Sequence, residues 1–145
     1  MRAKRLVRCG CRELGPRNTV SRSTTNPTWR QIAMAIRKLD GRHYHRINLE
    51  LADDAQGDVQ GSLAIEGGAG KYHIRGILAG QRNTRSYFDP AKRGRGHTRY
   101  WDWGDNSGCS LEEEHLCDDV ELVLWIARYF AEKGALLPQV KWKCV

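Results

Sequence analysis

The segment that most constrains the fold is the apolar helix predicted over residues 119–133. Asp118 or Asp119 suits the position before its first turn, because a carboxylate there accepts hydrogen bonds from free backbone amides. Gly134 suits the left-handed position after the last turn, and Pro138 prevents the helix from resuming. Apolar side chains occur nearly all around this helix: Val120, Leu122, Val123, Leu124, Trp125, Ile126, Ala127, Tyr129 and Phe130. We expect such a helix to be covered on several sides and to form the centre of the core.

An amphipathic helix is predicted at residues 26–41. Asn26 is a favourable N-cap, and Pro27 fits the first helical position, where a missing amide proton costs nothing. Apolar residues recur at helical spacing on one face: Trp29, Ile32, Ala33, Ile36 and Leu39. Asp40 and Gly41 end the helix. It should therefore pack by a single face.

The segments between the two helices alternate in polarity and predict an antiparallel meander. The predicted strands are residues 47–51, 59–66, 72–78, 84–88 and 99–103, with a short terminal strand at 140–142. The Gly67-Gly68-Ala69-Gly70 segment is interpreted as a hairpin turn, because a phosphate-binding loop would lead into a helix and this segment leads into a strand. The predicted fold class is α+β: an antiparallel sheet of about five or six strands with two helices packed on it.

The net charge of +7 is concentrated in the first 25 residues. They hold seven basic residues and one acidic residue, a net charge of +6, and show no periodicity of helix or strand. This composition predicts a disordered basic arm at 1–25, which is a candidate for weak nucleic-acid binding, followed by a single domain at 26–145. No apolar run is long enough to span a membrane, and five cysteines without a secretory signal favour reduced thiols in the cytoplasm.

Two oppositely charged segments are candidate binding surfaces. Residues 82–99 carry six basic residues and one acidic residue, a net charge of +5, beside aromatic residues that could stack on single-stranded nucleic acid. Residues 111–121 carry six acidic residues and no lysine or arginine. Adjacent surfaces of opposite sign favour a protein partner over nucleic acid. Two alternatives remain open: both segments are solvated loops, or the acidic residues simply favour the start of the following helix.

No pattern of residues predicts catalysis or metal binding. A zinc site built from Cys109, His115, Cys117 and Cys144 is the best alternative, but structural zinc sites usually contain pairs of closely spaced ligands. A hydrolase that uses Cys109 or Cys117 with a histidine lacks a recognisable nucleophile motif. We therefore predict a protein that is not an enzyme and has no cofactor or bound metal.

The order of motifs from residue 26 to residue 142 resembles a family of bacterial immunity proteins found beside polymorphic toxins. The motifs are NPTWRQIAMAIRKLDG at 26–41, INLEL at 47–51, the glycine-rich hairpin at 67–70, the aromatic pair Tyr129-Phe130 before Gly134, and the tail with Leu137-Pro138 and Trp142. The resemblance implies a small cytoplasmic α+β protein that binds and neutralises a cognate toxin, without a cofactor.

Charge and aromatic content, rather than the resemblance, select the predicted contact residues. They are Trp101, Asp102, Trp103, Asp105, Glu112, Glu113, Glu114 and Asp118. A toxin that acts on nucleic acid has a cationic active site, which an acidic segment would occupy as a substrate mimic. The alternative function is a nucleic-acid-binding accessory protein that uses the basic arm and residues 82–99.

Overall fold

The computed structural model describes residues 5–14, 19–53, 59–78, 80–100 and 109–144. Seven strands form one sheet: β1 Arg5–Leu14, β2 Thr19–Thr25, β3 Tyr44–Asp53, β4 Val59–Gly68, β5 Lys71–Leu78, β6 Arg85–Phe88 and β9 Lys141–Cys144. The other elements are α1 Trp29–Lys38, η1 Pro90–Lys92, β7 His97–Tyr100, β8 Cys109–Glu112, η2 Glu113–His115 and α2 Val120–Lys133.

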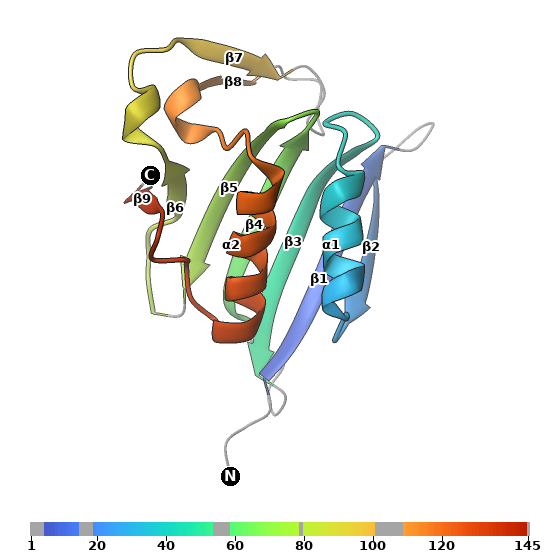
Figure 1. The fold of residues 1–145 in the computed structure, drawn as a ribbon. Helices are drawn as coiled ribbons and strands as arrows, with labels where there is room; N and C mark the ends of the chain where they lie inside the picture. Colours follow the sequence, from blue (N-terminus) through green and yellow to red (C-terminus); the bar gives the residue numbers. More distant parts are fainter. Residues whose placement is uncertain (1–4, 15–18, 54–58, 79, 101–108, 145) are drawn as a thin grey trace.

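The large sheet is antiparallel throughout, in the order β2-β1-β3-β4-β5-β6-β9, while β7 and β8 form a separate pair. Both α-helices lie side by side on one face of the large sheet (Figure 1). The predicted α+β class is confirmed, although the large sheet has seven strands rather than five or six. The strand predicted at 99–103 overlaps β7, which belongs to the small sheet, and its residues 101–103 lie outside the described part of the chain.

The N-terminal segment is part of this sheet. The prediction of a disordered arm is wrong for residues 5–14 and 19–25, which form β1 and β2. β1 pairs with β3, and Cys9 lies buried directly opposite Leu49. The pairing satisfies the backbone groups along the edge of the apolar strand β3. Residue 26 is therefore not a domain boundary.

Helix α1 begins later than predicted, because Thr28 and not Asn26 is its N-cap. The Thr28 side chain accepts a hydrogen bond from the Gln31 amide at 3.2 Å, and the Gln31 side chain accepts one from the Thr28 amide at 2.8 Å. This reciprocal capping box satisfies two backbone donors at once. Asn26 instead adopts a φ of 50° and donates its backbone amide to the Val7 carbonyl at 2.7 Å. The contact joins α1 to β1.

Helix α2 has the predicted ends: Asp119 caps its first turn, and Gly134 adopts the left-handed conformation. Its inner side is fully buried and packs in one cluster with the sheet: Val123, Ile126, Ala127, Phe130, Leu63, Ile65 and Ile74. α2 is covered on several sides as predicted, since Val120, Leu122 and Tyr129 are partly buried against the core, but one side of it stays open. Trp125, on the side away from the sheet, is 48% exposed.

The glycine-rich segment forms the predicted hairpin turn, between β4 and β5. Gly68 has a φ of 135°, and a Cβ atom there would lie 2.5 Å from the Leu39 carbonyl group. Gly70 has a φ of 87° but faces open space. Backbone conformation requires glycine at both positions, whereas close approach to another segment also requires it at Gly68.

We predict that Gly68→Ala lowers the free energy of unfolding by about 3 kcal/mol or more, because conformational strain adds to a backbone clash. Gly70→Ala serves as the matched control and should cost about 1–2 kcal/mol from strain alone. Urea unfolding measures both values. Equal losses in the two variants would contradict the packing of α1's C-terminus on the hairpin.

Candidate functional site

A polar pocket of about 560 Å³ lies between the large sheet and the β7–β8 pair. Its lining comes from β5, β6 and the residue before it, β7, β8, η2 and β9: His73, Arg75, Thr84, Ser86, His97, Leu111, Glu112, His115 and Lys143. In β5, His73 and Arg75 alternate with the buried residues Tyr72 and Ile74, so they face away from the helices. A second groove of about 370 Å³, between α1 and the β1–β2 edge, is mainly apolar. Titratable groups concentrate in the first pocket, which makes it the candidate site.

Ser86 connects two histidines in this pocket. Its hydroxyl is buried and donates to the Tyr87 carbonyl at 3.3 Å. His73 Nε2 lies 3.2 Å from the same hydroxyl oxygen and donates to it, since the hydroxyl proton is already used. His115 Nδ1 lies 3.3 Å from the Tyr87 carbonyl and 3.5 Å from the hydroxyl. Because a carbonyl only accepts, the hydrogen-bond network assigns a proton to Nδ1 of His115.

His73 is held neutral by its surroundings. Burial is the largest cause that lowers the pKa of its imidazole, and together with the positive charge of Arg75 and the nearby His115 it brings the pKa from 6.5 to about 3. A neutral imidazole keeps one proton, which His73 uses at Nε2 toward Ser86. His73 therefore acts as a fixed polar support at physiological pH rather than as a proton carrier.

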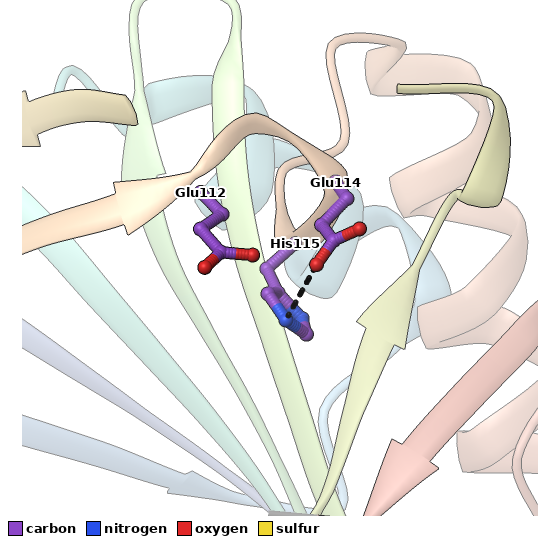
Figure 2. Close-up of side chains that lie close together, drawn as sticks. All are labelled: Glu112, Glu114 and His115. Atoms are coloured by element: carbon purple, nitrogen blue, oxygen red, sulfur yellow. Dashed lines mark ion pairs between the residues drawn. The ribbon is translucent and has the colours of Figure 1, made fainter. Parts of the chain in front are cut away.

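Two carboxylates lie close to His115, and one of them, Glu114, faces its other ring nitrogen. Glu112, Glu114 and His115 each place one ligand-type atom within 4.8 Å of the others (Figure 2). Glu114 Oε1 lies 3.8 Å from His115 Nε2, and Glu114 is only 6% exposed. A hydrogen bond with Glu112 lowers the pKa of the Glu114 carboxyl, opposed by burial and assisted by Lys143, His115 and Arg93. Arg93 Nε lies 3.7 Å from Glu114 Oε2.

The predicted contact residues that the structure describes do not form a continuous acidic surface. Glu114 is buried, and Glu113 is largely covered and forms an ion pair of 2.6 Å with Lys71. These two glutamates therefore expose little surface to a partner in this structure, and their contact with one stays a prediction. Glu112 and Asp118 are exposed, with side-chain exposed fractions of 54% and 65%. The other predicted contacts lie outside the described residues: Trp101, Asp102, Trp103 and Asp105.

The basic segment 82–99 and the acidic segment 111–121 form ion pairs and hydrogen bonds with each other. Lys92 is buried, donates to the Leu116 carbonyl at 2.7 Å and lies 3.3 Å from Asp118. Arg93 pairs with Glu114, and backbone hydrogen bonds join Asp89 to Glu114 and Glu113 to Gly96. The basic and acidic charges that the sequence places in separate segments therefore offset each other. Arg82 and Arg95 remain exposed, which leaves a smaller basic surface than composition predicts.

Two cysteines of the alternative zinc site, Cys117 and Cys144, have described side chains, whereas the side chain of Cys109 lies outside the described part of the structure. Cys117 is buried, its thiol donates to the Asp119 carbonyl at 3.4 Å, and burial raises its pKa. Such a thiol is a structural group rather than a nucleophile. Cys144 is exposed. Sequence reasoning missed the cluster of Glu112, Glu114 and His115, although the Glu-Glu-Glu-His run places all of them within four residues.

Comparison of this chain with protein-family models, with curated proteins and with solved structures finds no match. Among the described residues, neither α1 nor α2 is long and apolar enough to cross a membrane. The functional argument therefore starts from the residues and their geometry.

We predict that His73 makes stability sensitive to acid. Its folded-state pKa lies below the unfolded value of 6.5, so its stabilising contribution is complete above about pH 6.5 and is lost as the pH falls toward about 3. His73→Gln, which retains an amide donor for Ser86, should flatten the dependence of unfolding free energy on pH by up to about 1.4 kcal/mol per unit between about pH 6 and 4.

Urea unfolding across this pH range provides the measurement. The control is His43→Gln at the exposed histidine near Asp40, which should leave the slope close to that of the wild type. The same slope in His73→Gln and wild type would show that His73 titrates normally in the folded protein.

Proposed function

We propose that this protein is a non-catalytic immunity protein that binds and neutralises a cognate bacterial toxin domain in the cytoplasm. The observation that carries the proposal is the order of motifs between residues 26 and 142. NPTW leads into α1, INLEL lies in β3, the glycine-rich segment turns between β4 and β5, and the aromatic pair lies in α2. The C-terminal tail is held by an internal hydrogen bond, in which Trp142 Nε1 donates to the Leu137 carbonyl at 3.0 Å.

The outward side of α2 is the proposed centre of the toxin interface. Leu122, Trp125 and Tyr129 follow one another at helical spacing, with Trp125 half exposed and the other two partly buried. Exposed tryptophans on a rigid element are the usual anchors of protein interfaces, because they bury a large area at a small entropic cost. Glu121 and Arg128 are exposed on the same helix and would form part of a polar rim.

The exposed acidic residues at the start of α2 suit a cationic partner. Asp118 and Glu121 are both largely exposed there, at side-chain fractions of 65% and 72%. Rim charges of this kind accelerate association more than they raise affinity. The aromatic and acidic residues of segment 101–105 stay predicted contacts, and Glu112 adds a further exposed carboxylate. In this proposal the toxin is held by a tryptophan anchor and guided by the acidic end of the helix.

Neutralisation of a toxin tests the function directly. The toxin to use is the C-terminal domain of a large secreted protein encoded beside this chain. Expression of that domain alone in bacteria should reduce colony counts, and coexpression of this protein should restore them. A catalytically inactive form of the toxin is the control for the burden of expression. Continued killing during coexpression, with both proteins present in the soluble fraction, would contradict the proposal.

We predict that Trp125→Ala weakens toxin binding by about 30-fold or more, as expected for an interface anchor worth about 2 kcal/mol. Met34→Ala is the matched control, because Met34 is also an exposed apolar residue on the helix layer but lies on α1. It should change the dissociation constant by less than about twofold. Isothermal titration with the inactive toxin domain measures both. Equal effects of the two substitutions would place the interface elsewhere.

A further inference from the structure

One ring nitrogen of His115, Nε2, faces the Glu114 carboxylate and has no proton assigned to it. The hydrogen bond from Nδ1 to the Tyr87 carbonyl, at 3.3 Å, requires the proton on Nδ1. In the neutral imidazole, Nε2 then presents a lone pair, and it lies 3.8 Å from Glu114 Oε1. A lone pair and a carboxylate oxygen do not bind each other directly. A histidine that donates one N–H to a backbone carbonyl and turns the other nitrogen toward carboxylates has the usual arrangement of a metal ligand.

The buried carboxylate of Glu114 is incompletely satisfied. Its residue is 6% exposed, and Oε2 accepts no hydrogen bond from any described residue. The nearest positive group is Arg93, whose Nε lies 3.7 Å away and whose side chain is 71% exposed. A buried carboxylate without hydrogen bonds on one oxygen is costly unless another positive group compensates it. Oε2 is the oxygen on the Arg93 side, whereas Oε1 is the oxygen that faces His115, so an ion in the cluster would offset the charge of this carboxylate by binding at Oε1.

The spacing of the cluster suits a small cation. Glu112, Glu114 and His115 offer ligand atoms within 4.8 Å of one another, and their side chains converge in Figure 2. Two ligands of a tetrahedral zinc ion lie roughly 3.4 Å apart, so the separation of 3.8 Å between His115 and Glu114 needs only a small contraction. His97 lies opposite Glu112 in the β7–β8 pair, with Nε2 at 3.9 Å from Glu112 Oε1. It is within reach as a fourth ligand.

We propose that Glu112, Glu114 and His115 form a binding site for a divalent transition-metal ion such as Zn²⁺, which His97 completes. Imidazole nitrogen together with carboxylate oxygen favours zinc and its neighbours over magnesium or calcium, which prefer oxygen ligands alone. The ion would join β7, β8 and η2 across the pocket. Its role is structural, because the ligands come from the segments that the ion would hold together. Glu112 belongs to both proposals, but zinc binding is measured on this protein alone, so its outcome is distinguishable from that of toxin binding.

Two neighbouring cationic side chains lower the affinity expected for the metal ion. Lys143 and Arg93 both act on Glu114 electrostatically and oppose the entry of a further positive charge. We therefore expect a dissociation constant on the order of 1–10 μM, weaker than that of a closed cysteine-rich zinc site. Glu113 is engaged with Lys71 and contributes no ligand.

The test uses the full chain, freed of any affinity tag and of metal, in a Cys144→Ser background, because Cys144 is an exposed thiol. Titration with zinc chloride in a calorimeter should show one equivalent bound, and zinc should raise the melting temperature. His115→Ala and Glu114→Gln should each weaken zinc binding at least about tenfold and remove the thermal shift. His43→Gln is the matched control at the exposed pair of His43 and Asp40, and it should bind zinc like the parent.

Cobalt serves as a second probe. Its visible absorption should report nitrogen and oxygen ligands, without the intense charge-transfer band of a thiolate. No measurable zinc binding at 100 μM, roughly ten times the weakest constant expected, would overturn the proposal. Unchanged binding in His115→Ala, loss of binding in His43→Gln, or a thiolate band with cobalt would overturn it equally.

Discussion

The burial of α2 against the centre of the large sheet is the contact on which the other parts of this structure depend. Ile126, Phe130 and their neighbours fill the space above Leu63 and Ile74, and each large apolar side chain buried there contributes about 1.5–3 kcal/mol. The exposed ion pair of Arg37 and Glu121, which joins the two helices, contributes less than about 1 kcal/mol. Apolar packing therefore determines the position of the two helices on the sheet, and the ion pair between them contributes little to it.

The position of α2 also fixes the segment that precedes it. Tyr72 and Cys117 exchange two backbone hydrogen bonds of 2.8 Å, which hold the approach to α2 against β5. η2 is thereby placed over β6, and His115 reaches the Tyr87 carbonyl. The pocket with its histidines and carboxylates is a consequence of how the chain enters the helix. Its polar groups and the outward side of α2 are separate surfaces of one scaffold.

Charge in this protein has two different uses. Lys92, Lys71 and Arg93 are paired with acidic residues of the η2 region, where they hold loops together. At the start of α2, Asp118 and Glu121 also form ion pairs, with Lys92 and Arg37, but both carboxylates stay largely exposed and can meet a partner. For a protein proposed to neutralise a toxin, this division places the anchor on the outward side of the helix layer. It leaves the polar pocket for a bound ion that would brace the β7–β8 pair.

The sequence by itself determined the elements whose signals are local. Helical periodicity and the caps at Asp119 and Gly134 define α2, and the positive-φ glycines define the β4–β5 turn. These features depend on residues within a few positions of one another, so they can be read from the chain. The α+β class followed from the same patterns. The Glu-Glu-Glu-His run that carries the proposed ion site was also visible, although its spacing alone indicated no metal.

Tertiary structure decided everything that depends on contacts between distant segments. β1 is a strand because β3 provides its partner, although its own composition is typical of a disordered segment. Thr28 rather than Asn26 is the N-cap of α1, because the backbone amide of Asn26 donates to the Val7 carbonyl in β1. The acidic and basic segments form ion pairs with one another instead of two opposed surfaces, and one face of α2 suffices to bury its core residues while Trp125 stays exposed. Pairing and burial of this kind are settled by three-dimensional proximity, which no local pattern encodes.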